Sequence, residues 1–181
     1  MRHLLRCLAV LAVLAVALAP AAPAQHPQTR QGFWIGFGLG YGSLSFKCSG
    51  CSGSEGALSG YLKLGGTLGP KMLIGGETNG WTKSEGGGRL TAGNASAVVY
   101  FYPAPASGFW LRGGIGVASL TASSGSSSAS TSGLGFVIGT GYDFRVGAKM
   151  SVVPMASFNW GDLGSGTKQN VFQVAVGLTW H

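Results

Sequence analysis

Residues 170–181 read NVFQVAVGLTWH, and this stretch decides the fold. Large apolar side chains stand at every second position, with Val171 as the one apolar residue between them: Phe172, Val174, Val176, Leu178 and Trp180. Such alternation is typical of a β-strand whose two faces meet different surroundings. It is longer than the ~5–6 residues of an ordinary strand and matches the ~9–11 residues of a tilted strand that crosses a bilayer. We therefore expect a membrane-spanning strand with its bulky face toward lipid and Trp180 at an interface.

The N-terminus has the three regions of a secretory signal peptide. Arg2 and Arg6 give a basic start, residues 7–19 form an apolar run, and residues 22–24 read APA. The apolar run is shorter than the ~20 residues of a membrane-spanning helix, and no later stretch reaches that length. We expect a signal peptide at 1–24, cleavage between Ala24 and Gln25, an N-terminal segment at 25–31 and one barrel domain at 32–181.

Composition narrows the class of protein further. Charged residues make up 9% of the chain, against roughly 25% in a soluble domain. Of the 12 basic residues, Arg2 and Arg6 leave with the signal peptide, and 5 acidic residues oppose the rest. The remaining basic residues are scattered and do not alternate with aromatics, which argues against a nucleic-acid partner. Anionic lipid headgroups are the preferred partners for this modest positive charge.

The chain before residue 170 divides into further segments of the same alternating kind, at 33–42, 57–68, 72–82, 90–102, 109–120, 134–144 and 150–160. The connections at 47–55, 83–89, 121–133 and 161–169 are long and polar, whereas those at 69–71, 103–108 and 146–148 are short. This asymmetry is typical of outer-membrane barrels, which have short periplasmic turns and longer outer loops. The sequence predicts an all-β, eight-stranded, antiparallel up-and-down transmembrane β-barrel, closed between its first and last strands and monomeric.

The same assignment places aromatic residues in two girdles. At the periplasmic rim we expect Phe33, Phe101, Phe109, Tyr142, Phe144 and Trp180. At the outer rim we expect Tyr41, Phe46, Trp81 and Trp160. A soluble, exported, lipocalin-like barrel is an alternative, and it would place its apolar face inside and its polar face outside.

The mature chain resembles the small eight-stranded outer-membrane β-barrel family, which includes OmpX, the OmpA transmembrane domain and the opacity-like barrels. The resemblance depends on the overall pattern and on segments such as residues 135–144, GFVIGTGYDF. It implies an integral location in the outer membrane of a Gram-negative bacterium. It also implies that Trp180 belongs to a terminal signal read by the assembly machinery, although His181 follows it. Many functions share this fold, so the resemblance predicts architecture and not task.

Lys63 and Glu77 form the best-defined polar pair. A turn at 69–71 would place them directly opposite each other and facing inward, with Asn79 on the same face and Arg112 joining from another strand. One interpretation is an ion network that fills a narrow barrel, because cross-strand opposite charges stabilise a sheet and an unpaired buried charge is costly. The other is a narrow pore or a small-ligand site that uses Lys63, Glu77 and Arg112.

Other charged residues lie toward the two ends. Asp143 and Arg145 are expected to face inward at the periplasmic end and to pair locally. Lys47, Lys83, Arg89 and Lys168 lie in or beside the outer connections. They are candidates for contact with lipopolysaccharide phosphates, and solvated surface charge is the alternative.

Cys48 and Cys51 remain after processing, in the sequence CSGC. A short structural disulfide is the preferred interpretation in an exported protein. Free thiols and a functional pair stay open. A redox pair would need a helical context, and a metal site would need two more ligands.

An enzyme would need residues that the sequence does not bring together. His3 leaves with the signal peptide, His26 lies in the N-terminal segment and His181 ends the chain, so none is placed beside a strand-borne serine and an acid. The glycine-rich runs are not followed by helices, which excludes a nucleotide site. We expect no catalytic, cofactor or metal site. The expected role is structural or surface-interacting, with four outer loops.

Overall fold

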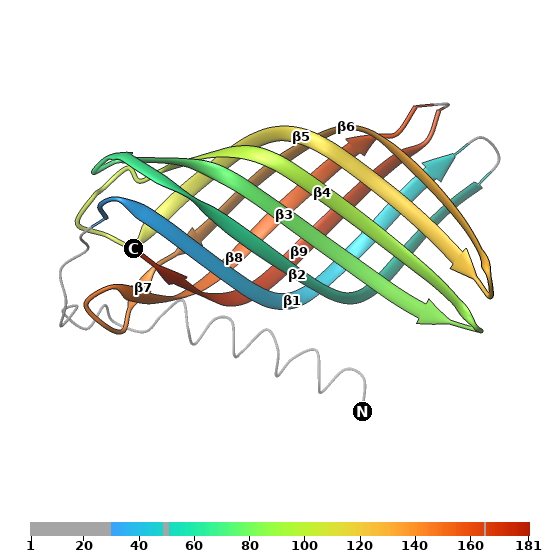
Figure 1. The fold of residues 1–181 in the computed structure, drawn as a ribbon, viewed down its shortest axis with the longest axis horizontal. Coiled ribbons are helices and arrows are strands. Elements are labelled where there is room, and N and C mark those ends of the chain that lie inside the picture. The colour runs from blue at the N-terminus through green and yellow to red at the C-terminus, as the bar shows by residue number, and fades with distance from the viewer. Residues whose placement is uncertain (1–29, 49–50, 165) are drawn as a thin grey trace.

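The computed structural model describes residues 30–48, 51–164 and 166–181. They form nine strands: β1 (Phe33–Cys48), β2 (Cys51–Gly69), β3 (Met72–Glu85), β4 (Gly88–Phe101), β5 (Phe109–Ser124), β6 (Ser127–Tyr142), β7 (Phe144–Arg145), β8 (Met150–Asp162) and β9 (Lys168–Trp180). Neighbouring strands pair antiparallel, β1 also pairs with β9, and β6 with β8. The sheet therefore closes into a barrel (Figure 1). The expected signal peptide and its cleavage site lie outside the described residues.

β7 is a continuation of β6 and adds no position around the barrel. Both strands pair with β8, as Gly141 lies opposite Met155 and Phe144 opposite Val152, with Asp143 between them. The predicted eight-stranded antiparallel barrel is thus confirmed. In the part of the chain that the structure describes, no helix is long and apolar enough to cross a membrane.

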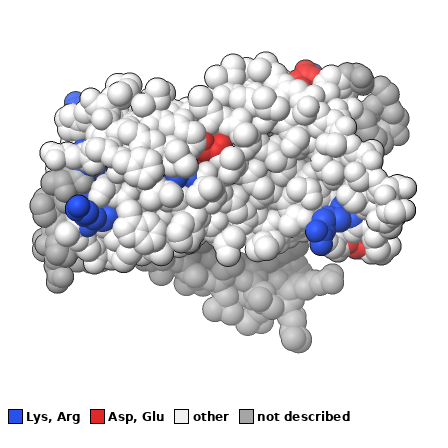
Figure 2. Space-filling model, in the orientation of Figure 1, with Lys and Arg blue, Asp and Glu red and all other residues white. Residues whose placement is uncertain are grey.

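The barrel is apolar outside and polar inside. On β1, large apolar side chains point outward, with Leu39 67% and Phe37 51% exposed, and the same holds around the barrel. Lys63, Glu77 and Arg112 are buried inside. Figure 2 shows mostly uncharged atoms on one side of the molecule. This arrangement is the reverse of a lipocalin-like barrel, so that alternative is wrong.

The aromatic girdles are confirmed at one rim and half wrong at the other. All six residues expected at the periplasmic rim are on the outer face; Tyr142 packs on Phe144, with 4.6 Å between ring centroids. At the outer rim, Tyr41 and Trp160 face outward, but Trp81 and Phe46 are on the inner face. Trp81 is 1% exposed. Because side chains alternate along β3, Trp81 lies on the same face as Glu77 and Asn79. Gly42 has no side chain, and this leaves the space that the Trp81 ring fills.

The prediction of long outer loops is wrong at three of the four connections, because strands extend through most of residues 47–55, 83–89 and 121–133. At the first connection β1 and β2 stay paired as far as Cys48 opposite Cys51, and the other two pairs of strands continue to hairpin turns at 86–87 and at 125–126. Gly86, Gly87 and Gly125 adopt positive φ angles of 57°, 79° and 56°, as tight hairpin turns require. Because a β-ladder needs only backbone partners, Ser- and Gly-rich sequence can extend it without apolar residues. The hairpins project at the right-hand end of Figure 1.

Candidate functional site

The centre of the barrel holds a buried ion pair that differs from the expected one. Lys63 lies directly opposite Glu77, as the predicted register requires. The Glu77 carboxylate, however, is paired with Arg112, and it also accepts hydrogen bonds from Tyr100 and, at 2.7 Å, from Asn79 Nδ2. Both side chains of the ion pair are fully buried. The structure therefore brings the predicted residues together but gives Glu77 a different cation.

The Lys63 ammonium lies among aromatic rings. Its Nζ is 5.0 Å from the ring centroid of Tyr100, 5.2 Å from Trp110, 5.7 Å from Tyr61 and 6.0 Å from Trp34. Ring faces attract a cation most strongly where water is excluded. Sequence reasoning missed this cluster, although all four aromatics stand at inward positions of the alternating pattern.

Above the ion pair, toward the hairpin end, lies a layer of buried amide side chains: Asn79, Asn94, Asn159, Gln169 and Gln173. They line a cavity of about 10 Å³, which is room for about one water molecule. Leu44, Trp81, Ala92 and Val171 form an apolar layer next to it. The interior is filled by side chains, as expected for a barrel of this size.

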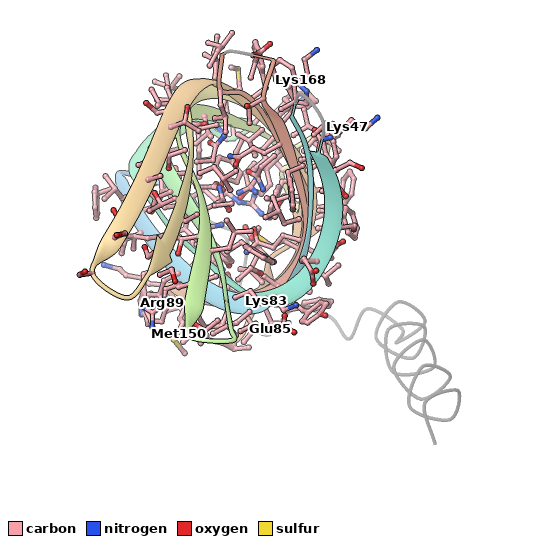
Figure 3. All side chains as sticks on the ribbon, turned by 90° about the vertical axis from the view of Figure 1, so that its right-hand side faces the viewer. Lys47, Lys83, Glu85, Arg89, Met150 and Lys168 are labelled. Atoms are coloured by element: carbon pink, nitrogen blue, oxygen red, sulfur yellow. The ribbon has the colours of Figure 1, made fainter. Side chains whose placement is uncertain are left out.

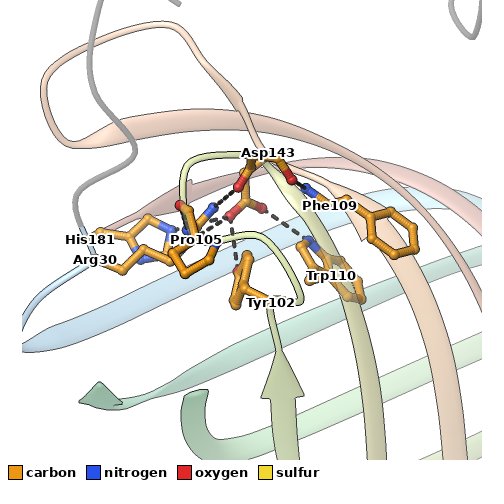
Figure 4. Close-up of polar contacts among 8 residues, drawn as sticks. Arg30, Tyr102, Pro105, Phe109, Trp110, Asp143 and His181 are labelled. Carbon is orange, nitrogen blue, oxygen red and sulfur yellow. Dashed lines mark hydrogen bonds and ion pairs between the residues drawn. The ribbon is translucent and has the colours of Figure 1, made fainter. Parts of the chain in front are cut away.

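The opposite mouth, where both ends of the described chain lie, is organised around Asp143 (Figure 4). Its carboxylate accepts hydrogen bonds from Tyr102 Oη at 2.9 Å and from Trp110 Nε1 at 3.0 Å. Arg30 Nε lies 3.5 Å and His181 Nε2 3.7 Å from Asp143 Oδ2. Residues from four distant parts of the chain thus meet at one buried acid.

Arg30 fastens the segment before β1 to this mouth. Its guanidinium donates to the carbonyl oxygens of Pro105, at 3.0 Å, and Ser107, at 2.9 Å, and it stacks over the Tyr102 ring at 3.6 Å. Sequence reasoning placed Arg30 in an N-terminal segment without a role. Arg145, expected beside Asp143, is also buried.

The hairpin end carries a further group of charges, which includes Lys47, Lys83, Glu85, Arg89 and Lys168 (Figure 3). Lys83 Nζ lies 2.6 Å from both Glu55 Oε2 and Glu85 Oε2. The hydrogen bonds that Lys83 donates to Glu55 and Glu85 raise the pKa of Lys83, and the bond to Glu85 lowers the pKa of Glu85. Lys47 and Lys168, both exposed, stand directly opposite each other on β1 and β9. Lys47 and Lys168 are thus exposed at this rim, whereas Lys83 is paired with two acids.

Arg89, the fourth of these cations, is exposed on the exterior face of β4. Its Nε donates to Ser84 Oγ at 3.3 Å. Among the described residues, no three His, Cys, Asp or Glu side chains lie close enough to hold a metal ion. The side chains of Cys48 and Cys51 lie outside what the structure describes, so their predicted disulfide stays a prediction.

Several solved structures share this fold. Ail, the attachment invasion locus protein of Yersinia pestis, is 18% identical with a TM-score of 0.62, over 82% of this chain and 99% of that one. Neisserial surface protein A is 16% identical with a TM-score of 0.58, over 84% and 98%. The N-terminal β-barrel domain of OprF from Pseudomonas aeruginosa is 10% identical with a TM-score of 0.56, over 84% and 98%. At these identities the likeness concerns the fold alone.

A search by sequence among curated proteins found no match. The sequence does match the family described as outer membrane protein beta-barrel domain, over residues 8–179. That match covers nearly all of the chain and agrees with the closed barrel and its apolar exterior. The chain therefore belongs to the outer membrane protein β-barrel domain family and is an integral protein of the bacterial outer membrane.

Proposed function

We propose that this barrel is a surface-interaction protein without enzyme activity, and that it engages an extended polypeptide through the protruding β5–β6 hairpin. The observation that carries this proposal is an unpaired strand edge. β6 pairs with β5 along its whole length, but its pairing with β8 begins only at Leu134, opposite Asp162. Next to this pairing, Thr131 donates its hydroxyl to the Leu163 carbonyl oxygen and Gly133 lies against Asp162. The backbone groups of residues 127–130 on that side are therefore the ones open to strand addition.

This edge lacks the features that normally prevent strand addition. Protective features include charged residues, proline and bulges. Residues 127–132 read SSASTS, and their register with β5 runs without a shift. All six are exposed on both faces of the hairpin. An added strand would gain main-chain hydrogen bonds without displacing any side chain that guards the edge.

Lipopolysaccharide phosphates are the proposed partners of the outer rim. Lys47 and Lys168 repel each other, because like charges directly opposite in a sheet are destabilising. An anion placed between the two ammonium groups would turn this repulsion into attraction. The solved structure of Ail, with the same fold, contains the heparin analogue sucrose octasulfate, so a barrel of this kind can bind a polyanion.

The narrow-pore and small-ligand alternatives have weaker support. The cavity among the buried amides has room for about one water molecule, and an apolar layer adjoins it. Glu77 and Arg112 fill the section below. We therefore propose a structural role for the interior network, which holds the barrel that presents the hairpin.

Strand addition can be tested with the purified barrel in phospholipid nanodiscs. The probe is a synthetic peptide that copies residues 119–124, the natural partner sequence of this part of β6. We expect the peptide to slow amide hydrogen exchange within residues 127–130. Ser127→Lys with Ala129→Lys should abolish the effect, because charges on an edge oppose pairing. Ser54→Lys, on the β1–β2 hairpin, is the control. Unchanged exchange in the wild-type barrel would contradict the proposal.

A further inference from the structure

Four neighbouring strands, β3 to β6, carry a row of hydroxyl side chains on the exterior of the protruding hairpins. The row consists of residues that stand directly opposite one another from strand to strand: Thr82, Thr91, Thr121 and Ser130. Thr82 Oγ1 lies 3.4 Å from Thr91 Oγ1, and Thr121 Oγ1 lies 2.9 Å from Ser130 Oγ. The side chains therefore lie side by side on one face.

The rows above and below continue this face. Toward the hairpin tips the next outward row consists of Ser84, Arg89, Ser123 and Ser128. Toward the membrane the next row consists of Gly80, Gly93, Ser119 and Ser132. Neighbouring strands are about 4.8 Å apart, and alternate residues along a strand are about 6.7 Å apart. The result is a lattice of hydroxyl groups interrupted by Gly80, Gly93 and Arg89, and each hydroxyl can both donate and accept a hydrogen bond.

The composition of this face favours one class of ligand. It holds no aromatic and no large aliphatic side chain, so it offers nothing to a lipid tail or to an apolar peptide. Arg89 is its single charge, whereas protein surfaces ordinarily carry about 25–35% charged residues. A ligand rich in hydroxyl groups, with an occasional anionic group for the Arg89 guanidinium, matches this chemistry.

The height of the face on the barrel identifies the source of that ligand. The next row toward the membrane contains Val117 opposite Leu134, where the apolar exterior begins. On β4 to β6 the hydroxyl lattice thus lies just outside the hydrocarbon region, at the level of the headgroups of the outer leaflet, and at its β3 edge Thr82 borders the exposed Leu58 of β2. In the bacterial outer membrane those headgroups are the sugars of lipopolysaccharide.

We propose that this hydroxyl face binds the core saccharide of lipopolysaccharide from the membrane that surrounds the barrel. The proposal deepens the lipopolysaccharide contact proposed above and rests on it, but it uses other residues and another part of the ligand. The two lysines would hold phosphates at one side of the barrel. The hydroxyl face would hold sugars at the β3–β6 side and order the two hairpins that carry the open edge of β6.

The test compares the same barrel in three nanodisc preparations: phospholipid alone, phospholipid with lipid A, and phospholipid with lipopolysaccharide that has a complete core. The readout is amide hydrogen exchange across residues 119–132. We expect the complete core to slow exchange about tenfold relative to lipid A, because ordering of a hairpin raises its opening free energy. Equal exchange with lipid A and with the complete core would overturn the proposal.

Matched variants separate the saccharide contact from other causes. Thr82→Val, Thr91→Val and Thr121→Val together remove hydroxyl groups while keeping β-branched shape, so the strands should still form. This triple variant should lose the core-dependent slowing, and Thr78→Val, on the same face of β3 within the apolar belt, should keep it. Slowing that survives in the triple variant would contradict the proposal. So would slowing that appears in phospholipid alone as protein density rises, since that result would indicate contact between two copies of the chain.

The outcomes also separate this proposal from those it rests on. A lipid A effect that disappears in Lys47→Gln with Lys168→Gln reports on the phosphate contact alone. Peptide-induced protection that is lost in Ser127→Lys with Ala129→Lys reports on the strand edge alone. These four side chains lie outside the hydroxyl rows, so each contact can fail by itself.

Discussion

Lys63 stands directly opposite Glu77 on β2 and β3, yet the Glu77 carboxylate is paired with Arg112 of β5. The Lys63 ammonium instead lies among four aromatic rings. Sequence register thus places both charges inside, but barrel closure decides which cation the acid meets. Arg112 also reaches Tyr100 Oη at 3.2 Å, so its planar guanidinium contacts two partners at once.

Removal of Arg112 should destabilise the barrel more than removal of Lys63. Arg112→Leu leaves Glu77 buried without its ion-pair partner, and we expect the free energy of unfolding to fall by about 3–5 kcal/mol. Lys63→Met keeps that ion pair. It loses cation–ring contacts worth about 2 kcal/mol, but it also removes the cost of burying the Lys63 charge, so we expect a smaller net change in the free energy of unfolding. Urea unfolding in phospholipid vesicles measures both.

A compensating variant serves as the control for this comparison. Arg112→Leu combined with Glu77→Leu removes both charges and should recover most of the loss, because apolar replacement of a buried pair is often neutral. If Lys63→Met proved as damaging as Arg112→Leu, the assignment of Arg112 as the principal partner of Glu77 would be contradicted.

Asp143 should be the key residue for closure of the periplasmic mouth. Asp143→Asn removes the charge that faces Arg30 and His181. It also turns one of the two oxygens that accept from Tyr102 and Trp110 into an NH2 donor. We expect a loss of about 3 kcal/mol or more in unfolding free energy. Lys149→Gln, on the exposed neighbouring turn, should change it by less than about 0.5 kcal/mol. Similar small effects from both variants would contradict the role given to Asp143.

Much of the barrel, but less of its two mouths, could be predicted from the sequence. The alternation of side chains determines which residues face inward, because it is a local property. The turn at 69–71 predicts that Lys63 lies opposite Glu77. In the structure Gly69 pairs with Met72, and a register shift between Thr67 and Gly69 brings Lys63 opposite Glu77. The meeting of Arg30, Trp110 and His181 at Asp143 depends on closure of the whole sheet, and no local pattern encodes it. Residues 121–133 looked like a loop because their Ser and Gly content carries no apolar alternation, although backbone pairing alone extends the hairpin.

The ion pairs of Lys83 with Glu55 and Glu85 predict how the stability of the folded barrel changes with pH. Hydrogen bonding from Lys83 lowers the pKa of Glu85 in the folded barrel. A carboxyl with a lowered folded pKa stabilises the folded state above its unfolded pKa, and the contribution is lost as pH falls through the folded pKa. Lys83→Gln should raise the Glu85 pKa toward its ordinary value, as NMR titration of the side-chain carboxyl would show. An unchanged pKa would exclude Lys83 as the cause.

Trp180 is expected to matter more for assembly in cells than for stability. Its ring stacks on Phe37, with 5.8 Å between centroids, and such a pair is worth about 0.5–1.5 kcal/mol. If Trp180 belongs to a terminal assembly signal, Trp180→Ala should sharply reduce the heat-modifiable protein in outer-membrane fractions while refolding in detergent stays efficient. Trp160→Ala, at the opposite rim, is the control. Equal assembly of the two variants would contradict a special role for Trp180.

The central claim is that the hairpins, with the open edge of β6, face the outside of the cell while the short turns face the periplasm. Cysteine labelling tests it most directly, in a background with Cys48→Ser and Cys51→Ser. Intact cells would be treated with a membrane-impermeant maleimide after Ser128→Cys, at the β5–β6 hairpin, or Ala148→Cys, at the turn before β8. We predict that Ser128→Cys is labelled on intact cells and Ala148→Cys only after the outer membrane is permeabilised. The reverse pattern would contradict the orientation and the proposed surface function together.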